Sequence, residues 1–242
     1  MAISFPDWAT PATVCSAPGS RVQQEVKGRI RTSNEAGILR AAEHVFARAG
    51  FAGATMSAIA EYAGMPKSNL HYYFRTKKEI YRAVLANTLS LWLVQTDGIR
   101  ADNDPQRALA DYIRAKMMLS TSHPDASRVF ANEILHGAAD IVDYLRADLR
   151  TLIDAKSRVI EGWIAAGQMA RVDPRHLFFT IWASTQTYAD FAPQVCAVLG
   201  VAQLDAQHME TATANLTSLL LRGCGLVPDA VYSLTNSEKP DA

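Results

Sequence analysis

The sequence has little cysteine, no long hydrophobic run and no excess of either charge. Its three cysteines, Cys15, Cys196 and Cys224, are far apart and lack the paired spacing of zinc or redox sites, so we expect free thiols in a reducing compartment. No apolar run approaches the roughly 20 residues needed to span a bilayer, and the first residues lack the layout of a signal peptide. These absences predict a cytoplasmic protein with no membrane partner.

The residue sets that carry out catalysis are also missing. There is no Gly-rich phosphate loop and no Ser/His/Asp set, and none of the six histidines has a partner at metal-ligand spacing within one helix. Glu133 and Asp140 are more typical of helix-face charges than of catalysts. We therefore expect no enzyme, no cofactor and no metal site.

No segment alternates apolar and polar residues as a strand does. Apolar residues instead recur every three or four positions, as on one face of a helix. The first such helix covers residues 33 to 49 and is closed by Gly50. The others are expected over residues 77 to 98, 105 to 122, 124 to 135, 140 to 170, 174 to a bend or end near Pro193, and 204 to 223. The fold class is therefore all-α.

The net charge of zero hides an uneven distribution. Residues 27 to 82 contain ten Lys or Arg and only four Glu, a net charge of +6, so the rest of the chain carries −6. A basic N-terminal module on an acidic body favours nucleic acid as a partner of one end only. Residues 1 to 30 lack periodicity and are expected to form a disordered arm, whose basic residues either reach DNA or stay solvated.

Residues 55 to 74 fit two short helices joined by a tight turn. Ser57 is a candidate N-cap for the first helix, and Gly64 ends it because Gly adopts positive φ without a Cβ clash. The second helix opens at Lys67 or Ser68 and turns Leu70 and Phe74 inward. Its outward residues are cationic, hydrogen-bonding or aromatic, as a recognition helix requires: Lys67, Ser68, Asn69, His71 and Tyr72.

This block resembles the DNA-binding domain of the TetR family of transcriptional repressors. The resemblance implies a three-helix DNA-binding domain, a homodimer and a double-stranded operator. Pro66, Ser68 and His71 depart from the common pattern, which affects the operator sequence and not the fold. We expect Lys67, Tyr72 and Lys77 to hold phosphates, Ser68, Asn69 and His71 to face base edges, and Thr55 to join the DNA-binding set. The motif positions are Gly50-Phe51, Thr55, Ile59-Ala60, Ala63-Gly64, residues 67 to 74, and Lys77.

A second informative segment covers residues 182 to 195. Phe178, Trp182, Gln186 and Asp190 are spaced by four and so share one helix face. Such a row suits a planar heterocycle with alternating donors and acceptors, because Trp stacks on its face while Gln and Asp pair with its edge. Uracil has that edge. The same residues could instead form a dimer interface with satisfied hydrogen bonds.

The segment is similar to the regulatory domain of pyrimidine-responsive members of the same family, which implies uracil or thymine as effector. Trp182 and Gln186 are then the firmest ligand contacts, with Tyr188 and Asp190 weaker. We expect DNA binding in residues 31 to 80, ligand binding and dimerisation in 81 to 226, and a flexible tail in 227 to 242. The alternatives are a repressor with a different effector, or an architectural DNA-binding protein without one.

Overall fold

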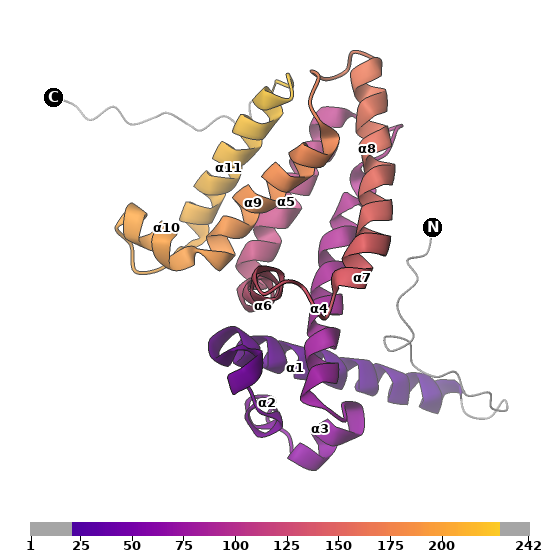
Figure 1. Ribbon diagram of the computed structural model, residues 1–242, viewed down its shortest axis with the longest axis vertical. Helices are drawn as coiled ribbons and strands as arrows, with labels where there is room; N and C mark the ends of the chain where they lie inside the picture. The colour runs from indigo at the N-terminus through magenta and orange to yellow at the C-terminus, as the bar shows by residue number, and fades with distance from the viewer. Residues whose placement is uncertain (1–20, 228–242) are drawn as a thin grey trace. The chain divides into compact units, whose positions relative to one another are not determined.

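The computed structural model describes residues 21–227, and the side chains from residue 33 onward. This part of the chain is helical and contains no strand, so the expected all-α class is confirmed (Figure 1). The chain divides into two compact units. The first, the reading unit, comprises Met1–Ser90 and Arg128–Val142, and the second, the body unit, comprises Leu91–Ser127 and Asp143–Ala242. The boundaries between the two units therefore fall inside three helices.

The reading unit begins with α1 (Arg21–Gly53), α2 (Met56–Tyr62) and α3 (Lys67–Tyr73), followed by most of α4 (Lys77–Leu93) and the end of α6 (Pro124–Leu135). Its core contains large side chains with almost no exposed surface, which removes apolar area from water: Ile38, Phe46, Ile59, Leu70, Ile80 and Leu85.

Two details differ from the sequence-based expectations, and one agrees with them. Residues 21–30 belong to α1 and are not disordered; residues 1–20 lie outside the described part. Helix formers such as Gln, Glu, Lys and Arg dominate that stretch, so local propensity continues the helix towards the N-terminus. The cap of α2 is Thr55 and not Ser57. Gly50 does end the first straight run of α1, with φ 67° and ψ 174°, before helical geometry resumes.

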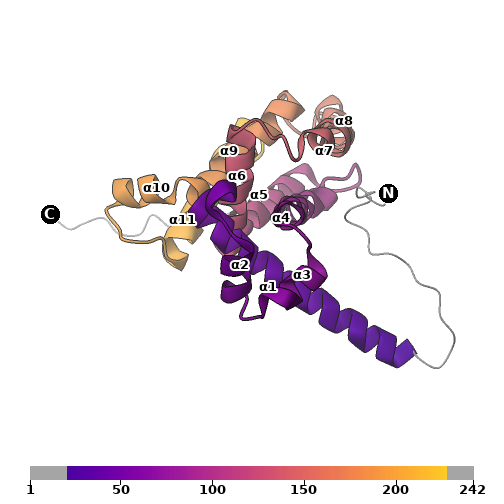
Figure 2. The same ribbon diagram turned by 60° about the horizontal axis from the view of Figure 1, so that its bottom comes forward.

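The body unit is built on α5 (Pro105–Ser122), α9 (Pro174–Asp190) and α11 (Ala206–Gly223), which lie side by side in Figures 1 and 2. α8 (Arg150–Ala165) packs on α9, and α10 (Ala192–Leu199) follows α9 in the chain. The core of this unit joins aromatic and aliphatic side chains from these helices: Leu109, Ile113, Met117, Ile160, Trp163, Phe178, Ile181 and Leu221. A single-turn helix η1 (Val94–Gly98) precedes α5.

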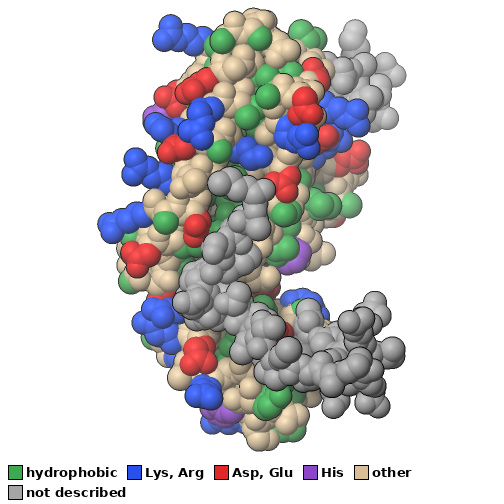
Figure 3. Space-filling view, turned by 90° about the vertical axis from the view of Figure 1, so that its right-hand side faces the viewer, with side chains coloured by type: hydrophobic (Ala, Val, Ile, Leu, Met, Phe, Trp, Pro, Cys, Tyr) green, Lys and Arg blue, Asp and Glu red, His purple; other side chains and the backbone are tan. Residues whose placement is uncertain are grey.

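Proline and glycine set the ends of these helices as the sequence predicts. Asp104 and Asp173 cap α5 and α9, and each is followed by Pro in the first turn. The expected helix over residues 140 to 170 is shorter: α7 (Val142–Tyr144), a π-turn η2 (Leu145–Leu149) and α8 run on to Ala165, where Gly167 adopts φ 71°. On the face drawn in Figure 3, Lys and Arg side chains lie among Asp and Glu side chains. Arg175 and Asp154 form one of the ion pairs of the body unit, at 2.8 Å.

Candidate nucleic-acid interface and candidate ligand site

The pair α2 and α3 has the geometry of a helix-turn-helix. Gly64 has φ 65°, which lets the chain turn sharply after α2. Leu70 is fully buried on the inner side of α3. All five residues expected on its outer side, Lys67, Ser68, Asn69, His71 and Tyr72, are exposed. The helix thus offers one apolar face to the unit and one polar face to a partner.

Thr55 and Lys77 have structural partners that the sequence did not reveal. The Thr55 hydroxyl accepts a hydrogen bond from the Ala58 N–H at 3.1 Å and so caps α2. The Lys77 ammonium donates to the carbonyl oxygens of Phe51, Ala52 and Ala54 at 2.6, 3.2 and 2.8 Å. An ammonium has three N–H donors, so none is left for a phosphate in this arrangement. Lys77 therefore ties α4 to the end of α1, and its expected phosphate role stays a prediction.

In the body unit, Trp182 is held by α5. Its indole N–H donates to the hydroxyl of Tyr112 at 2.7 Å, and its ring centroid lies 6.1 Å from that of Phe178 and 5.7 Å from that of Phe179. Burial raises the pKa of Tyr112, so this hydroxyl stays protonated. The indole is thus fixed in position by one hydrogen bond and two aromatic neighbours.

Two further polar contacts bind α9, one from α5 and one from α6. The Ser120 hydroxyl donates to the Thr185 carbonyl oxygen at 2.9 Å, and the Ser127 hydroxyl donates to the Asp190 carboxylate at 2.6 Å. Half-buried Gln186 lies between these contacts along α9. Among the residues whose side chains are described, none forms a hydrogen bond with the Gln186 amide.

Lys116 is the functional candidate that sequence reasoning missed. It lies on α5 between Tyr112 and Ser120, is only 2% exposed, and holds its ammonium 3.9 Å from the centre of the Trp92 ring. Burial lowers its pKa to about 7, although the charge of Asp190 opposes the shift. The sequence did contain a signal for this residue, because a lysine stands four positions after Tyr112 on the apolar face of an amphipathic helix.

The structure does not bring all four expected ligand residues together. Trp182, Gln186 and Asp190 follow one line along α9, but Tyr188 faces a hollow between α9, α10 and α11 that Phe191 and Val198 also line. Trp182 additionally borders an apolar pocket of about 380 Å³ with Leu149 and Ile153. The candidate ligand site is therefore built from two sets of side chains, Trp182 with Tyr112 and Lys116 with Trp92 and Asp190. Gln186 shares the line of Trp182 and Asp190 along α9.

The described part of the chain contains neither a metal-binding group of side chains nor a helix that could span a membrane. Within residues 33–227, no group of three or more His, Cys, Asp or Glu side chains is placed to bind a metal ion. Over the described helices, none is both long and apolar enough to cross a membrane.

Both halves of the chain match known regulators. Residues 38–84 match the family described as bacterial regulatory proteins, tetR family, and residues 85–227 match the YcdC-like protein, C-terminal region. The chain is 43% identical over 197 residues to the HTH-type transcriptional regulator RutR of Escherichia coli K12, covering 81% of this chain and 93% of that protein. It is 26% identical over 192 residues to the HTH-type transcriptional repressor NicS of Pseudomonas putida, covering 77% and 90%.

Solved structures share the fold at lower identity. AibR in complex with isovaleryl coenzyme A and operator DNA has a TM-score of 0.58 at 18% identity, over 77% of this chain and 97% of that one. PfmR from Thermus thermophilus has a TM-score of 0.57 at 17% identity, over 76% and 97%. The families and the curated relatives are transcription regulators and not enzymes. The chain therefore belongs to the TetR family of bacterial transcriptional regulators.

Proposed function

We propose that the protein is a homodimeric repressor that binds a palindromic operator and is released from it by a pyrimidine base such as uracil or thymine. α3 enters the major groove, with Ser68, Asn69 and His71 at the base edges and Lys67 and Tyr72 at phosphates. The exposure of all five side chains supports this division.

The observations that carry the effector proposal are the half-buried Gln186 amide, which shares one line of α9 with Trp182 and Asp190, and buried Lys116 on α5. The amide offers one acceptor and two donors, and it is half-buried without a partner among the described side chains. Lys116 supplies a further donor in either protonation state. A uracil ring presents alternating carbonyl and N–H groups that match these donors and acceptors, while Trp182 supplies a flat apolar surface.

The pKa of Lys116 also favours a neutral, acceptor-rich ligand. With that pKa lowered to about 7 by burial, the amine is only partly charged at neutral pH. A carbonyl oxygen of uracil accepts a hydrogen bond from either form, so binding does not require a full ion pair in the protein interior. The Asp190 carboxylate already accepts a hydrogen bond from Ser127. Gln186 is therefore the residue that selects among planar ligands by the pattern of donors and acceptors on their rings.

The test is a titration of uracil read by both calorimetry and release of operator DNA. Gln186→Leu should weaken uracil binding by about 1–3 kcal/mol for each lost hydrogen bond and leave operator affinity unchanged. Gln168→Leu, at an exposed position, is the matched control and should respond like the wild type. A normal response of Gln186→Leu, or no heat and no release with the wild type, would rule out the pyrimidine effector.

Two alternatives give different results in the same experiment. If Gln186 and Trp182 belong to the dimer interface, Gln186→Leu will shift the monomer–dimer equilibrium and not the uracil affinity. If the protein is an architectural DNA binder, a cognate duplex and random DNA will bind alike at the same salt concentration.

A further inference from the structure

The body unit contains a second pocket, of about 380 Å³, lined by η2, α8 and the first half of α9. Of the side chains in the candidate ligand site, Trp182 alone lines this pocket as well. The pocket is therefore a separate place for a ligand, with one wall in common with the first. Its other apolar walls are Leu145, Leu149, Ile153 and Phe179.

These apolar walls are partly open to water. Phe179 is 50% exposed, and its ring centroid lies 5.7 Å from that of Trp182, so two aromatic rings border the same hollow. Leu145 and Leu149 stand at the two ends of the π-turn η2, a local widening of a helix that is frequent at functional sites. Covering such surface is favourable in proportion to the apolar area removed from water. The walls therefore favour a ligand with an apolar body.

The volume of the pocket limits the size of that body. A volume of about 380 Å³ lies within the range of small-molecule sites, about 300–1,000 Å³. At about 30 Å³ for each water-sized group, the pocket holds roughly 12 non-hydrogen atoms. A single substituted ring or a short alkyl chain has this size, whereas a nucleotide or a coenzyme is too large.

Three charged side chains complete the lining, and they carry unequal charge. The Arg175 guanidinium donates to Asp154 Oδ1 through Nε at 3.2 Å and through Nη2 at 2.8 Å. Arg150 Nε lies 3.9 Å from the other oxygen of the same carboxylate. One carboxylate thus faces two guanidiniums, which leaves one positive charge in excess. Since a guanidinium has five N–H donors, Arg175 retains donors for a second carboxylate.

We propose that this pocket binds a small monocarboxylate with an apolar body, such as an arylalkanoate. The body packs on Phe179, Trp182 and the leucines of η2, and the carboxylate pairs with Arg175 and Arg150. Charge complementarity selects this class, because a cation would meet two guanidiniums and a dicarboxylate would exceed the single positive charge in excess. The proposal does not depend on a pyrimidine effector.

The experiment measures binding of phenylpropanoate and of its neutral amide, phenylpropanamide, to the full-length protein by isothermal titration calorimetry. The acid should bind with a Kd between about 10 µM and 1 mM, which a ligand of this size reaches in an open pocket. The amide should bind about 3- to 10-fold more weakly, and added salt should reduce the difference because the guanidiniums are exposed. No heat with the acid at millimolar concentration, or equal affinities for acid and amide, would overturn the proposal.

Two substitutions among the charged residues should act in opposite directions. Arg175→Gln should weaken binding of the acid by about 3- to 10-fold and leave the amide unchanged. Asp154→Asn should strengthen binding of the acid by a similar factor, because the Asp154 carboxylate competes for the same guanidiniums. A gain in affinity has no explanation in partial unfolding.

The matched controls are Arg107→Gln and Asp111→Asn, which break an exposed ion pair of α5 outside the pocket. Both should keep the wild-type affinity for the acid. Unchanged or weaker binding of the acid by Asp154→Asn would contradict the proposed contact with the guanidiniums.

Phe179→Ser tests the apolar wall and should weaken acid and amide alike. If this variant instead sediments as a smaller species and the acid gives no heat with the wild type, the face binds a second copy of the chain and the proposal fails. Full competition between phenylpropanoate and uracil would also overturn it, because the acid would then occupy the candidate ligand site. Simultaneous binding, with each Kd changed by less than about 10-fold, supports a second site. If the wild type ignores uracil but binds the acid with these variant effects, the pyrimidine effector fails and the carboxylate site stands.

Discussion

At the scale of single residues, Lys77 shows how a cation of the reading unit can bind the backbone of its own chain. Its ammonium binds three carbonyl oxygens at the end of α1 and lies 4.7 Å from the Phe51 ring centre. Those carbonyls carry the negative end of the helix dipole, which a cation stabilises. We expect Lys77→Ala to lower the free energy of unfolding by about 1–3 kcal/mol, measured by urea denaturation. A variant with unchanged stability and only weaker DNA binding would favour the phosphate role over the structural one.

Gly50 is the second residue with a defined conformational role. With φ 67° and ψ 174° it occupies a region that residues with a Cβ rarely adopt, although no atom lies within 4 Å of the added methyl. Gly50→Ala should therefore destabilise the protein by about 1–3 kcal/mol through backbone strain alone. Gly37→Ala is the matched control, because Gly37 lies inside α1 with equal free space and should gain about 0.5–1 kcal/mol. Thermal unfolding measures the change in melting temperature for both variants. Equal changes for Gly50→Ala and Gly37→Ala would contradict a strained backbone at Gly50.

At the scale of elements, the outer residues of α3 fall into two groups, those expected to bind phosphates and those expected to face base edges. Replacing Lys67 by Ala should weaken binding to all DNA sequences alike and lower the salt slope by about one. Replacing Asn69 by Ala should cost about 1–3 kcal/mol on the cognate operator and little on random DNA. Fluorescence anisotropy at several salt concentrations measures both. Identical losses on both kinds of DNA for both variants would reject this division.

α5 carries the pH dependence of the body unit through Lys116. Its pKa falls from 10.5 in the unfolded chain to about 7 in the folded protein because of burial, so the unfolded state binds more protons between these two values. Stability should therefore rise with pH across that window, by at most about 1.4 kcal/mol per pH unit, and level off below pH 7.

The measurement is the urea midpoint at pH 7, 8 and 9 for the wild type and Lys116→Met. In Lys116→Met, the stability should rise less steeply with pH, because the contribution of the Lys116 amine is missing. Lys67→Met, at an exposed position, should keep the wild-type slope. Parallel curves for wild type and Lys116→Met would show that the buried amine does not titrate in this range.

At the scale of the whole molecule, the apolar surface of the body unit predicts the homodimer. The hollow between α9, α10 and α11 is bordered by Phe191, Val198 and Leu199, which are 56%, 81% and 52% exposed. Contiguous apolar surface of this kind marks an interaction site, and an obligate interface buries about 2,000 Å² or more. A dimer is also needed to place two copies of α3 about 34–36 Å apart, or further if the half-sites are more widely spaced.

Val198→Glu should dissociate this dimer and abolish operator binding, because a charge would be buried at the interface. Val94→Glu, at an exposed site outside the hollow, should leave it intact. Sedimentation velocity at micromolar concentration measures the oligomeric state of the wild type and of both variants. A wild-type monomer without DNA, or a dimeric Val198→Glu, would contradict the proposed interface.

The sequence by itself determined the all-helical class and the starts of several helices. The starts of α5 and α9 follow from Asp-Pro pairs, the turn before α3 follows from Gly64, and the inward side of α3 follows from Leu70. These features are local: a cap, a positive φ or an apolar spacing involves residues within about four positions, so the order of residues along the chain contains them.

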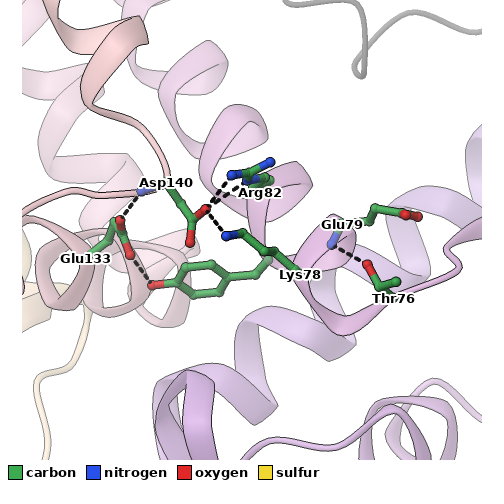
Figure 4. A network of polar contacts seen from close by, with 7 residues as sticks. Thr76, Lys78, Glu79, Arg82, Glu133 and Asp140 are labelled. Atoms are coloured by element: carbon green, nitrogen blue, oxygen red, sulfur yellow. Dashed lines mark hydrogen bonds and ion pairs between the residues drawn. The ribbon is translucent and has the colours of Figure 1, made fainter.

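The tertiary structure alone decided which polar groups meet. Lys77 binds carbonyls more than twenty residues away, Tyr112 binds Trp182 seventy residues on, and Glu133 joins Tyr81 to Asp140. Each of these partners lies on another helix or in a loop between helices, and contact depends on how helices pack and not on periodicity. The sequence therefore predicted the fold and the outer residues of α3. The buried lysine, the fixed indole and the contacts of Glu133 with Tyr81 and Asp140 (Figure 4) followed only from packing.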